Sequence, residues 1–195
     1  MKFELGQIYH IYNQGNNNNK TFYTNENYLF FLRKMKKYLQ PNCHILAYCL
    51  MDNHFHLLVT PTEFGIENYN SNSSILKSNL SWGIANLLSS YTKAINVQEG
   101  RTGSLWRRDT KKKLVSSSSL LEDYAAWCFV YIHQNPVVAG MVDSAEQWMY
   151  SSFQDYLGMR NGTMCNQVLA QELLKIRENE LLLRSILPQE FNLDL

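Results

Sequence analysis

The sequence has almost no excess of charge and no pattern of paired cysteines. Its 18 lysines and arginines stand against 17 acidic residues, for a net charge of +1. The net charge therefore does not indicate a nucleic-acid-binding protein. Any nucleic-acid-binding surface must be formed by a local cluster of basic residues. The four cysteines, Cys43, Cys49, Cys128 and Cys165, form neither a CxxC motif nor a regular framework. We therefore expect reduced thiols in a cytoplasmic protein.

Long apolar runs and several familiar catalytic motifs are also missing. No apolar run approaches membrane-spanning length, and the first residues are too polar for the core of a signal peptide. We therefore expect a soluble protein without a membrane partner. The motifs GxSxG, GxxxxGK[ST], GxGxxG and HExxH do not occur. A hydrophobic fraction of 45% and an aromatic fraction of 13% predict a folded globule.

The hydrophobic patterns predict strands alternating with helices. Strands are expected over Gln7–Asn13, on both sides of a turn near Asp52 within His44–Thr60, and in the second half of Arg101–Val115. Helices are expected from about Thr24 to Gln40, from Ser73 to about Val97, and from Leu120 to Asn135 with Pro136 as a stop signal. This order predicts an α+β fold, a ferredoxin-like split-βαβ sandwich in which helices cover mainly one face of an antiparallel sheet.

The C-terminal part of the chain has shorter patterns. Met141–Leu157 predicts a connection and a short helix that packs through Trp148, Phe153 and Tyr156, and Gln167–Leu183 predicts a last helix.

Two histidines separated by one residue stand out in the second half of His44–Thr60. Along a strand, His54 and His56 point to one face of the sheet and Phe55 points to the other. Two imidazoles that converge on one point suit a divalent metal ion that needs further ligands. A packed, hydrogen-bonded histidine pair is the more common arrangement, so spacing alone leaves both interpretations open.

The helix expected before Pro136 carries tyrosines and an amide at helical spacing. Tyr124, Tyr131 and Asn135 lie near one face, whereas His133 lies off that face. A tyrosine that attacks phosphorus, with an amide oxygen one turn later that binds a metal ion, would complete the histidine pair. Ordinary packing of the tyrosines over the sheet is the alternative.

A basic stretch surrounds Trp106. Its charges could contact phosphates while the Trp106 ring stacks on a base. A solvated edge strand protected by lysines is the competing interpretation. The candidate DNA-binding residues are Trp106, Arg107, Arg108, Lys111, Lys112 and Lys113.

Three separated segments resemble the Y1 tyrosine transposases of the insertion-sequence 200-like superfamily, and within it the REP-associated tyrosine transposases. The segments are YCLMDNHFHLLVTP (Tyr48–Pro61), YIHQNPVVAG (Tyr131–Gly140) and WMYSSFQDYLG (Trp148–Gly158). YHIYNQG near the start and SLWRRDTKKKL in the middle are also similar. Because the resemblance covers about residues 7–158, we expect residues 1–158 to form an HUH tyrosine transposase domain and residues 159–195 a helical C-terminal extension.

The resemblance implies which residues act. His54 and His56 would bind Mg²⁺ or Mn²⁺, Tyr131 would be the nucleophile, and Asn135 would supply a third metal ligand. Tyr124 is an alternative nucleophile, and His133 is a possible base.

The sequence departs from many relatives at three positions. Those relatives have proline where Asp52 stands and arginine where Gln14 and Val138 stand. The catalytic set is intact, but two arginines are missing from the expected DNA surface.

The implied function is that of a metal-dependent single-stranded DNA endonuclease and strand transferase in DNA transposition. It would act through a 5′-phosphotyrosine intermediate on hairpin-forming, REP-like DNA. Two alternatives remain, namely a metal-dependent nuclease that uses water and a noncatalytic nucleic-acid-binding module. The sequence leaves open whether the protein is a monomer or a homodimer.

Overall fold

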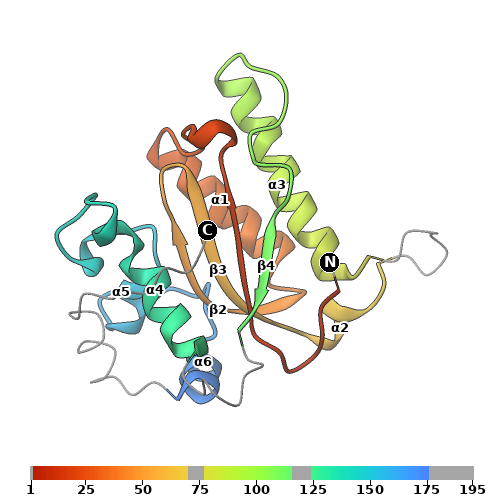
Figure 1. Ribbon diagram of the computed structural model, residues 1–195, viewed down its shortest axis with the longest axis vertical. Helices are drawn as coiled ribbons and strands as arrows, with labels where there is room; N and C mark the ends of the chain where they lie inside the picture. Colours follow the sequence, from red (N-terminus) through yellow and green to blue (C-terminus); the bar gives the residue numbers. More distant parts are fainter. Residues whose placement is uncertain (1, 70–76, 116–123, 176–195) are drawn as a thin grey trace.

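The computed structural model describes residues 2–69, 77–115 and 124–175. Its centre is a four-stranded sheet with the order β2-β3-β1-β4, in which all neighbouring strands are antiparallel (Figure 1). This order is the one that a split-βαβ connection produces. The α+β fold and the antiparallel sheet are therefore confirmed. The strands are β1 (Tyr9–Gln14), β2 (Cys43–Leu50), β3 (His54–Pro61) and β4 (Lys111–Leu114).

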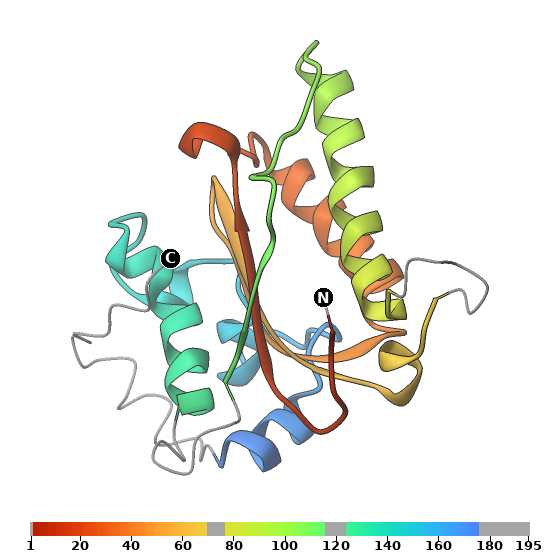
Figure 2. The same cartoon turned by 45° about the vertical axis from the view of Figure 1, so that its right-hand side comes forward.

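Helices cover both faces of this sheet. Helices α1 and α3 lie on one face, and α4 lies on the other, with α5 and α6 beside it near β2 (Figure 2). The prediction that helices lie mainly on one face is therefore wrong for the C-terminal part of the chain. The bounds are α1 Asn25–Tyr38, α2 Glu63–Ile66, α3 Asn79–Gln98, α4 Tyr124–Val138, α5 Phe153–Tyr156 and α6 Gln167–Leu174, with 3₁₀ turns at η1 Asn16–Asn18 and η2 Ala145–Gln147.

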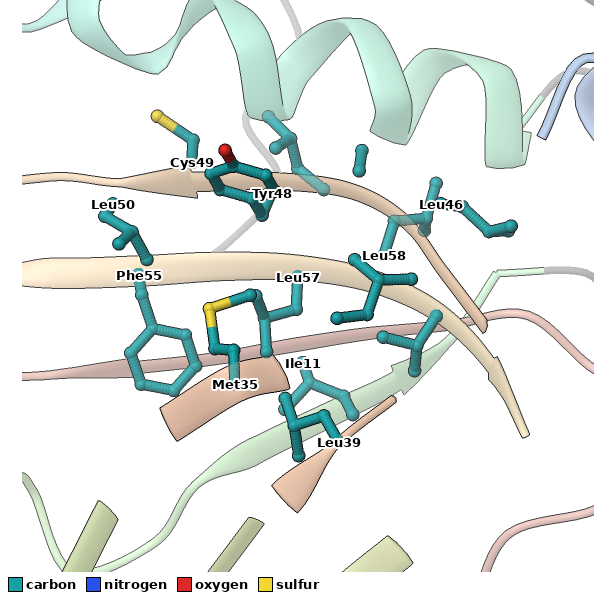
Figure 3. Close-up of a cluster of buried hydrophobic side chains, with 14 of the residues drawn as sticks. Ile11, Met35, Leu39, Leu46, Tyr48, Cys49, Leu50, Phe55, Leu57 and Leu58 are labelled. Carbon is teal, nitrogen blue, oxygen red and sulfur yellow. The ribbon is translucent and has the colours of Figure 1, made fainter. Parts of the chain in front are cut away.

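The core between the sheet and α1 follows from the alternation of the central strands. Phe55 and Leu57 of β3 point toward Met35 of α1 and Leu39 directly after it, together with Ile11 of β1 (Figure 3). Each of these side chains is at most 1% exposed. Burying an apolar side chain of this size stabilises the fold by about 1.5–3 kcal/mol. This layer therefore fixes which face of β3 is left for the histidines.

Helix α4 continues through Pro136, where the sequence predicted a stop. Proline has no N–H, so the helix loses one internal hydrogen bond, but its fixed φ is compatible with a helix. The turn is completed by backbone N–H groups that follow, since Ala139 donates to Asn135 (2.9 Å) and Met141 to Pro136 (2.9 Å). The predicted start at Leu120 lies outside the described residues, as does the predicted start of the preceding helix at Ser73.

The segment after α4 covers the outer edge of β2. Leu50 donates its backbone N–H to Tyr150 (3.0 Å), and Ser152 donates its own to Tyr48 (3.0 Å). Trp148, Phe153 and Tyr156 pack against the core, as predicted. Backbone groups at the edge of β2 thereby form hydrogen bonds within the chain. They are then not available for pairing with a strand of another molecule.

The described part of the C-terminal extension also packs on β2, where Asn166 donates its N–H to Ile45 (2.9 Å). Helix α6 ends at Leu174, and the predicted continuation to Leu183 lies outside the described residues. The division of the chain at residue 158 stays a prediction.

The four cysteines are buried free thiols, as predicted. Within residues 2–69, 77–115 and 124–175, no helix is both long and apolar enough to cross a membrane.

Trp106 belongs to the core, so the prediction that its ring stacks on a DNA base is wrong. It is only 3% exposed, and its ring lies 5.3 Å from that of Phe55, 5.9 Å from Tyr91 and 6.1 Å from Phe22. The loop that carries it is held against β1, because Trp106 forms a bridge with Gly15. The charged neighbours of Trp106 in the sequence suggested that its ring lies on the surface. Its packing against other aromatic rings places it in the core instead.

The Trp106→Ala substitution is expected to lower the free energy of unfolding by about 3–5 kcal/mol, because it removes a large ring from a closed aromatic cluster. Urea denaturation measures this change. The matched control is Trp82→Ala, since Trp82 is half-buried and its ring contacts that of the exposed Tyr69. A loss at Trp106 no larger than that at Trp82 would contradict the assignment of Trp106 to the core.

Candidate active site

His54 and His56 share the face of β3 that is turned away from α1. Their ring centroids are 5.0 Å apart, with an angle of 87° between the ring planes. Phe55, between them, is fully buried in the opposite layer. The sequence prediction of two imidazoles on one face is confirmed.

Helix α4 brings Tyr131 over this face. The Tyr131 ring lies 5.5 Å from the His56 ring in an edge-to-face contact. Burial raises the pKa of Tyr131, and a polar interaction with Asn135 partly opposes that rise. The phenol is therefore protonated at neutral pH and must lose its proton before or during any attack.

Asn135 joins the same group one turn further along α4. Its Nδ2 donates to the backbone carbonyl of Tyr131 (2.8 Å). Its Oδ1 is then the atom that can bind a metal ion or accept a hydrogen bond. The Asn135 side chain also raises the pKa of His54, against the larger lowering by burial. The structure thus brings together His54, His56, Tyr131 and Asn135.

The histidine nitrogens are arranged as metal ligands usually are. His54 Nε2 and His56 Nε2 are buried atoms without a hydrogen-bond partner among the described residues. The opposite nitrogens are held, since His54 Nδ1 lies 2.6 Å from Asn53 Oδ1 and His56 Nδ1 lies 2.9 Å from His10 Nε2. Burial lowers the pKa of both rings, and of His56 most strongly, so both are neutral near pH 7. Two neutral, unpartnered nitrogens fit a divalent cation.

The part of the chain that the structure describes contains no group of three or more His, Cys, Asp or Glu side chains arranged to hold a metal ion. The amide oxygen of Asn135, which this residue set does not include, is a candidate for a third protein ligand.

His10 of β1 is a site residue that sequence reasoning missed. It is 2% exposed, and its ring stacks on that of His56 at 5.1 Å between centroids. The available signal was weak, because a single histidine in a β-rich segment gives no partner until the neighbouring strand is known. Strand pairing places Tyr12 directly opposite His56, so His10 is its diagonal neighbour.

The alternative role of His133 is contradicted by its position. Its side chain is 1% exposed and faces α5, where Nε2 lies 2.7 Å from Ser152 Oγ. It packs on Phe129 and Phe153 and anchors α4.

Tyr124 lies two turns before Tyr131, and its ring contacts the ammonium group of Lys113 at 5.4 Å. This position places it beside β4 and favours Tyr131 over Tyr124 as the nucleophile.

The lysine run of β4 is divided between the two faces of the sheet. Lys111 pairs with Tyr12 and Lys113 with His10, so both lie on the histidine face. Lys112 pairs with Ile11 and points the other way, where its Nζ donates to the Lys2 carbonyl and lies 4.9 Å from the Phe3 ring centre. Lys112 therefore lies on the opposite face from the other two lysines, and its contact with DNA stays a prediction.

Arg107 and Arg108 lie on a different surface. They line a groove of about 860 Å³ between α3 and the loop that follows it, together with Lys93 and Arg101. Arg107 donates to Asn18 Oδ1 (2.7 Å). None of the described residues that line this groove is acidic. Its charge suits a phosphate backbone.

Comparison with known proteins gives two informative matches, although no protein-family profile matches the chain. A provisionally named REP-associated tyrosine transposase of Haemophilus influenzae is 29% identical over 108 residues, which are 55% of this chain and 57% of that protein. A REP-associated tyrosine transposase solved in complex with a REP hairpin has a TM-score of 0.59 and 18% identity, over 81% of this chain and 83% of that one.

The chain is similar in sequence and in fold to REP-associated tyrosine transposases. The match covers little more than half of the Haemophilus relative, and the structural likeness, at 18% identity, shows the fold alone. The DNA substrate and the cleavage activity of such transposases are therefore only proposals for this chain.

The stability of the protein should fall as the pH drops below about 6.5. Burial lowers the pKa of His133 to about 3 in the folded state, so below the ordinary histidine pKa only the unfolded chain takes up this proton. The expected loss is about 1.4 kcal/mol per pH unit for each such histidine, and the stabilising contribution is complete above about pH 6.5.

Urea denaturation between about pH 5 and pH 7 measures this loss, and His133→Phe should make the dependence shallower by about one proton. An equal slope in the variant would contradict the neutral, buried state of His133.

Proposed function

We propose that this protein is a metal-dependent endonuclease and strand transferase that acts on single-stranded DNA through a 5′-phosphotyrosine intermediate. The observation that carries the proposal is the contact of Tyr131 with His56, on a face where two buried histidine nitrogens have no partner. The similarity to REP-associated tyrosine transposases supports hairpin-forming DNA as the substrate and transposition as the process. We expect the protein to act in the cytoplasm.

The two histidines and Asn135 would hold a Mg²⁺ or Mn²⁺ ion. His54 and His56 would bind through Nε2, and Asn135 would bind through Oδ1. When bound, the ion would polarise the scissile phosphate and offset the negative charge that develops on it. Because two of the three ligands are imidazoles, the set favours Mn²⁺ over Mg²⁺.

Tyr131 would form the covalent bond. Its phenolic oxygen would attack phosphorus and lose its proton to solvent, while the bond from phosphorus to the 3′ oxygen of the preceding nucleotide breaks and that oxygen takes up a proton. That nucleotide departs with a 3′-hydroxyl, while the 5′ phosphate stays on the tyrosine. A 3′-hydroxyl can later reverse the step, which joins strands without another energy source. The interaction with Asn135 favours the phenolate, in part against burial.

The DNA would enter along β4. Lys111 and Lys113 lie on the histidine face beside Tyr12 and His10, where they can contact phosphates next to the cleavage site. The groove that contains Arg107 and Arg108 supplies a second basic surface for the backbone of a hairpin.

We further propose that Tyr131 and the two histidines of one chain form a single active site, so that a monomer can carry out the reaction. Tyr131 already contacts His56 of the same chain, and the edge of β2 is occupied by the segment that contains Tyr150. A mixture of Tyr131→Phe and His54→Ala proteins should therefore be inactive. Restored activity would show that the tyrosine helix is exchanged between copies.

Incubation with hairpin-bearing single strands and Mn²⁺ should give a denaturation-resistant protein–DNA adduct. Tyr131→Phe should abolish the adduct, because it removes the attacking oxygen while it keeps the ring packing. Gel electrophoresis under denaturing conditions detects the adduct, and peptide mapping locates it. A chelator or the His54→Ala substitution should reduce adduct formation by at least about 100-fold.

Tyr124→Phe is the matched control and should form the adduct. Undiminished cleavage by Tyr131→Phe would overturn the proposal and favour a nuclease that uses water. Binding without any cleavage in Mn²⁺ would favour a noncatalytic binding module.

The paired substitution of Lys111 and Lys113 by Gln should weaken DNA binding and lower its salt dependence. Each lost phosphate contact reduces the slope of log K against log salt by about 0.7 for a single strand, so the double variant should lose about 1.4. Fluorescence anisotropy at several salt concentrations measures the slope.

Lys112→Gln is the control within the same strand, since Lys112 faces away from the histidines and should leave the slope unchanged. An equal loss in this variant would show that the lysines act through general charge and not through the histidine face.

A further inference from the structure

We propose that His10 is a positioning residue that fixes the tautomer of His56, an inference that rests on the proposed metal site. In this arrangement His56 Nδ1 donates a hydrogen bond to His10 Nε2. The Nε2 lone pair of His56 is then directed at the metal ion.

The hydrogen bond between the two histidines is buried and well formed. His10 Nε2 and His56 Nδ1 are 2.9 Å apart, and the side chains are 2% and 0% exposed. Tyr12 and Tyr131 flank the His56 ring at 5.8 Å and 5.5 Å between centroids and contact it by packing. The bond from His10 therefore sets which nitrogen of His56 carries the proton.

Only one direction of this bond produces a metal ligand. A neutral imidazole has one N–H and one lone pair. If His10 donated, His56 would carry its proton on Nε2, which could not then bind a cation. That N–H would also be a buried donor without a partner among the described residues, at a cost of about 1–3 kcal/mol. If His56 donates, its buried Nε2 keeps a lone pair that a bound cation can satisfy, and His10 carries its own proton on Nδ1.

His54 has the same arrangement, in which a neighbouring group holds Nδ1, and here the acceptor is unambiguous. Its Nδ1 lies 2.6 Å from Asn53 Oδ1, and Asn53 Nδ2 is oriented by donation to the Asn18 carbonyl (3.1 Å). The amide oxygen can only accept, so His54 must carry its proton on Nδ1 and offer Nε2. His10 performs for His56 what Asn53 performs for His54, but from a different strand. Partners of this kind orient metal-binding histidines generally.

Two substitutions separate positioning from packing. His10→Gln offers an amide oxygen that can accept the His56 proton, whereas His10→Leu has a similar volume and no acceptor. Isothermal titration with Mn²⁺ should show about 10–100-fold weaker binding for His10→Leu, and binding close to that of the unsubstituted protein for His10→Gln. Thermal unfolding without metal confirms that each variant is folded.

Nitrogen-15 NMR of the metal-free protein reads the tautomer directly. His56 should carry its proton on Nδ1 in the unsubstituted protein and in His10→Gln, and should become a mixture of tautomers in His10→Leu. A proton on His56 Nε2 in the unsubstituted protein would overturn the inference, as would unchanged Mn²⁺ affinity in a folded His10→Leu variant. The tautomer measurement needs neither a variant nor a metal ion. If the unsubstituted protein bound no Mn²⁺, the proposed metal dependence would fail instead, independently of the tautomer.

Discussion

The candidate site depends on the packing of α4 against the face of the sheet opposite α1. Tyr131 and His133 are two residues apart on this helix, so their side chains point in directions separated by roughly 200°. His133 binds Ser152 on the α5 side, and Tyr131 thereby lies over the histidines. Ser152 in turn accepts the N–H of Tyr48 in β2 (3.0 Å). Buried polar contacts thus anchor α4, and with it the proposed nucleophile Tyr131, to the sheet.

The histidine face places polar groups where a sheet would otherwise bury apolar side chains. Burial makes the imidazoles neutral, and neutral rings can offer lone pairs. An unpartnered buried nitrogen costs stability, and such costs are commonly found at functional sites. The large apolar layer around Phe55 and Leu57 on the other face can offset them. The apolar side chains that stabilise the fold and the candidate site residues His54 and His56 therefore lie on opposite faces of β3.

Much of this arrangement could be predicted from local patterns. The period of two in a strand placed His54 and His56 together and Phe55 apart from them, and helical spacing placed Asn135 one turn after Tyr131. The same rule, applied to β4, would have separated Lys112 from its neighbours once the strand was defined. Pro136 gave a misleading signal because its fixed φ fits a helix, and the loss of one hydrogen bond is tolerated at the end of α4.

The sequence by itself determined the order of strands and helices, the shared face of the two histidines and the motif that contains Tyr131. Only the tertiary structure placed α4 over the histidines, buried Trp106 among aromatic rings and brought His10 to 2.9 Å from His56. The physical reason is that periodicity is a property of neighbouring residues, whereas strand pairing and helix packing join segments far apart in the chain. A lone histidine has no readable partner until β1 and β3 lie side by side.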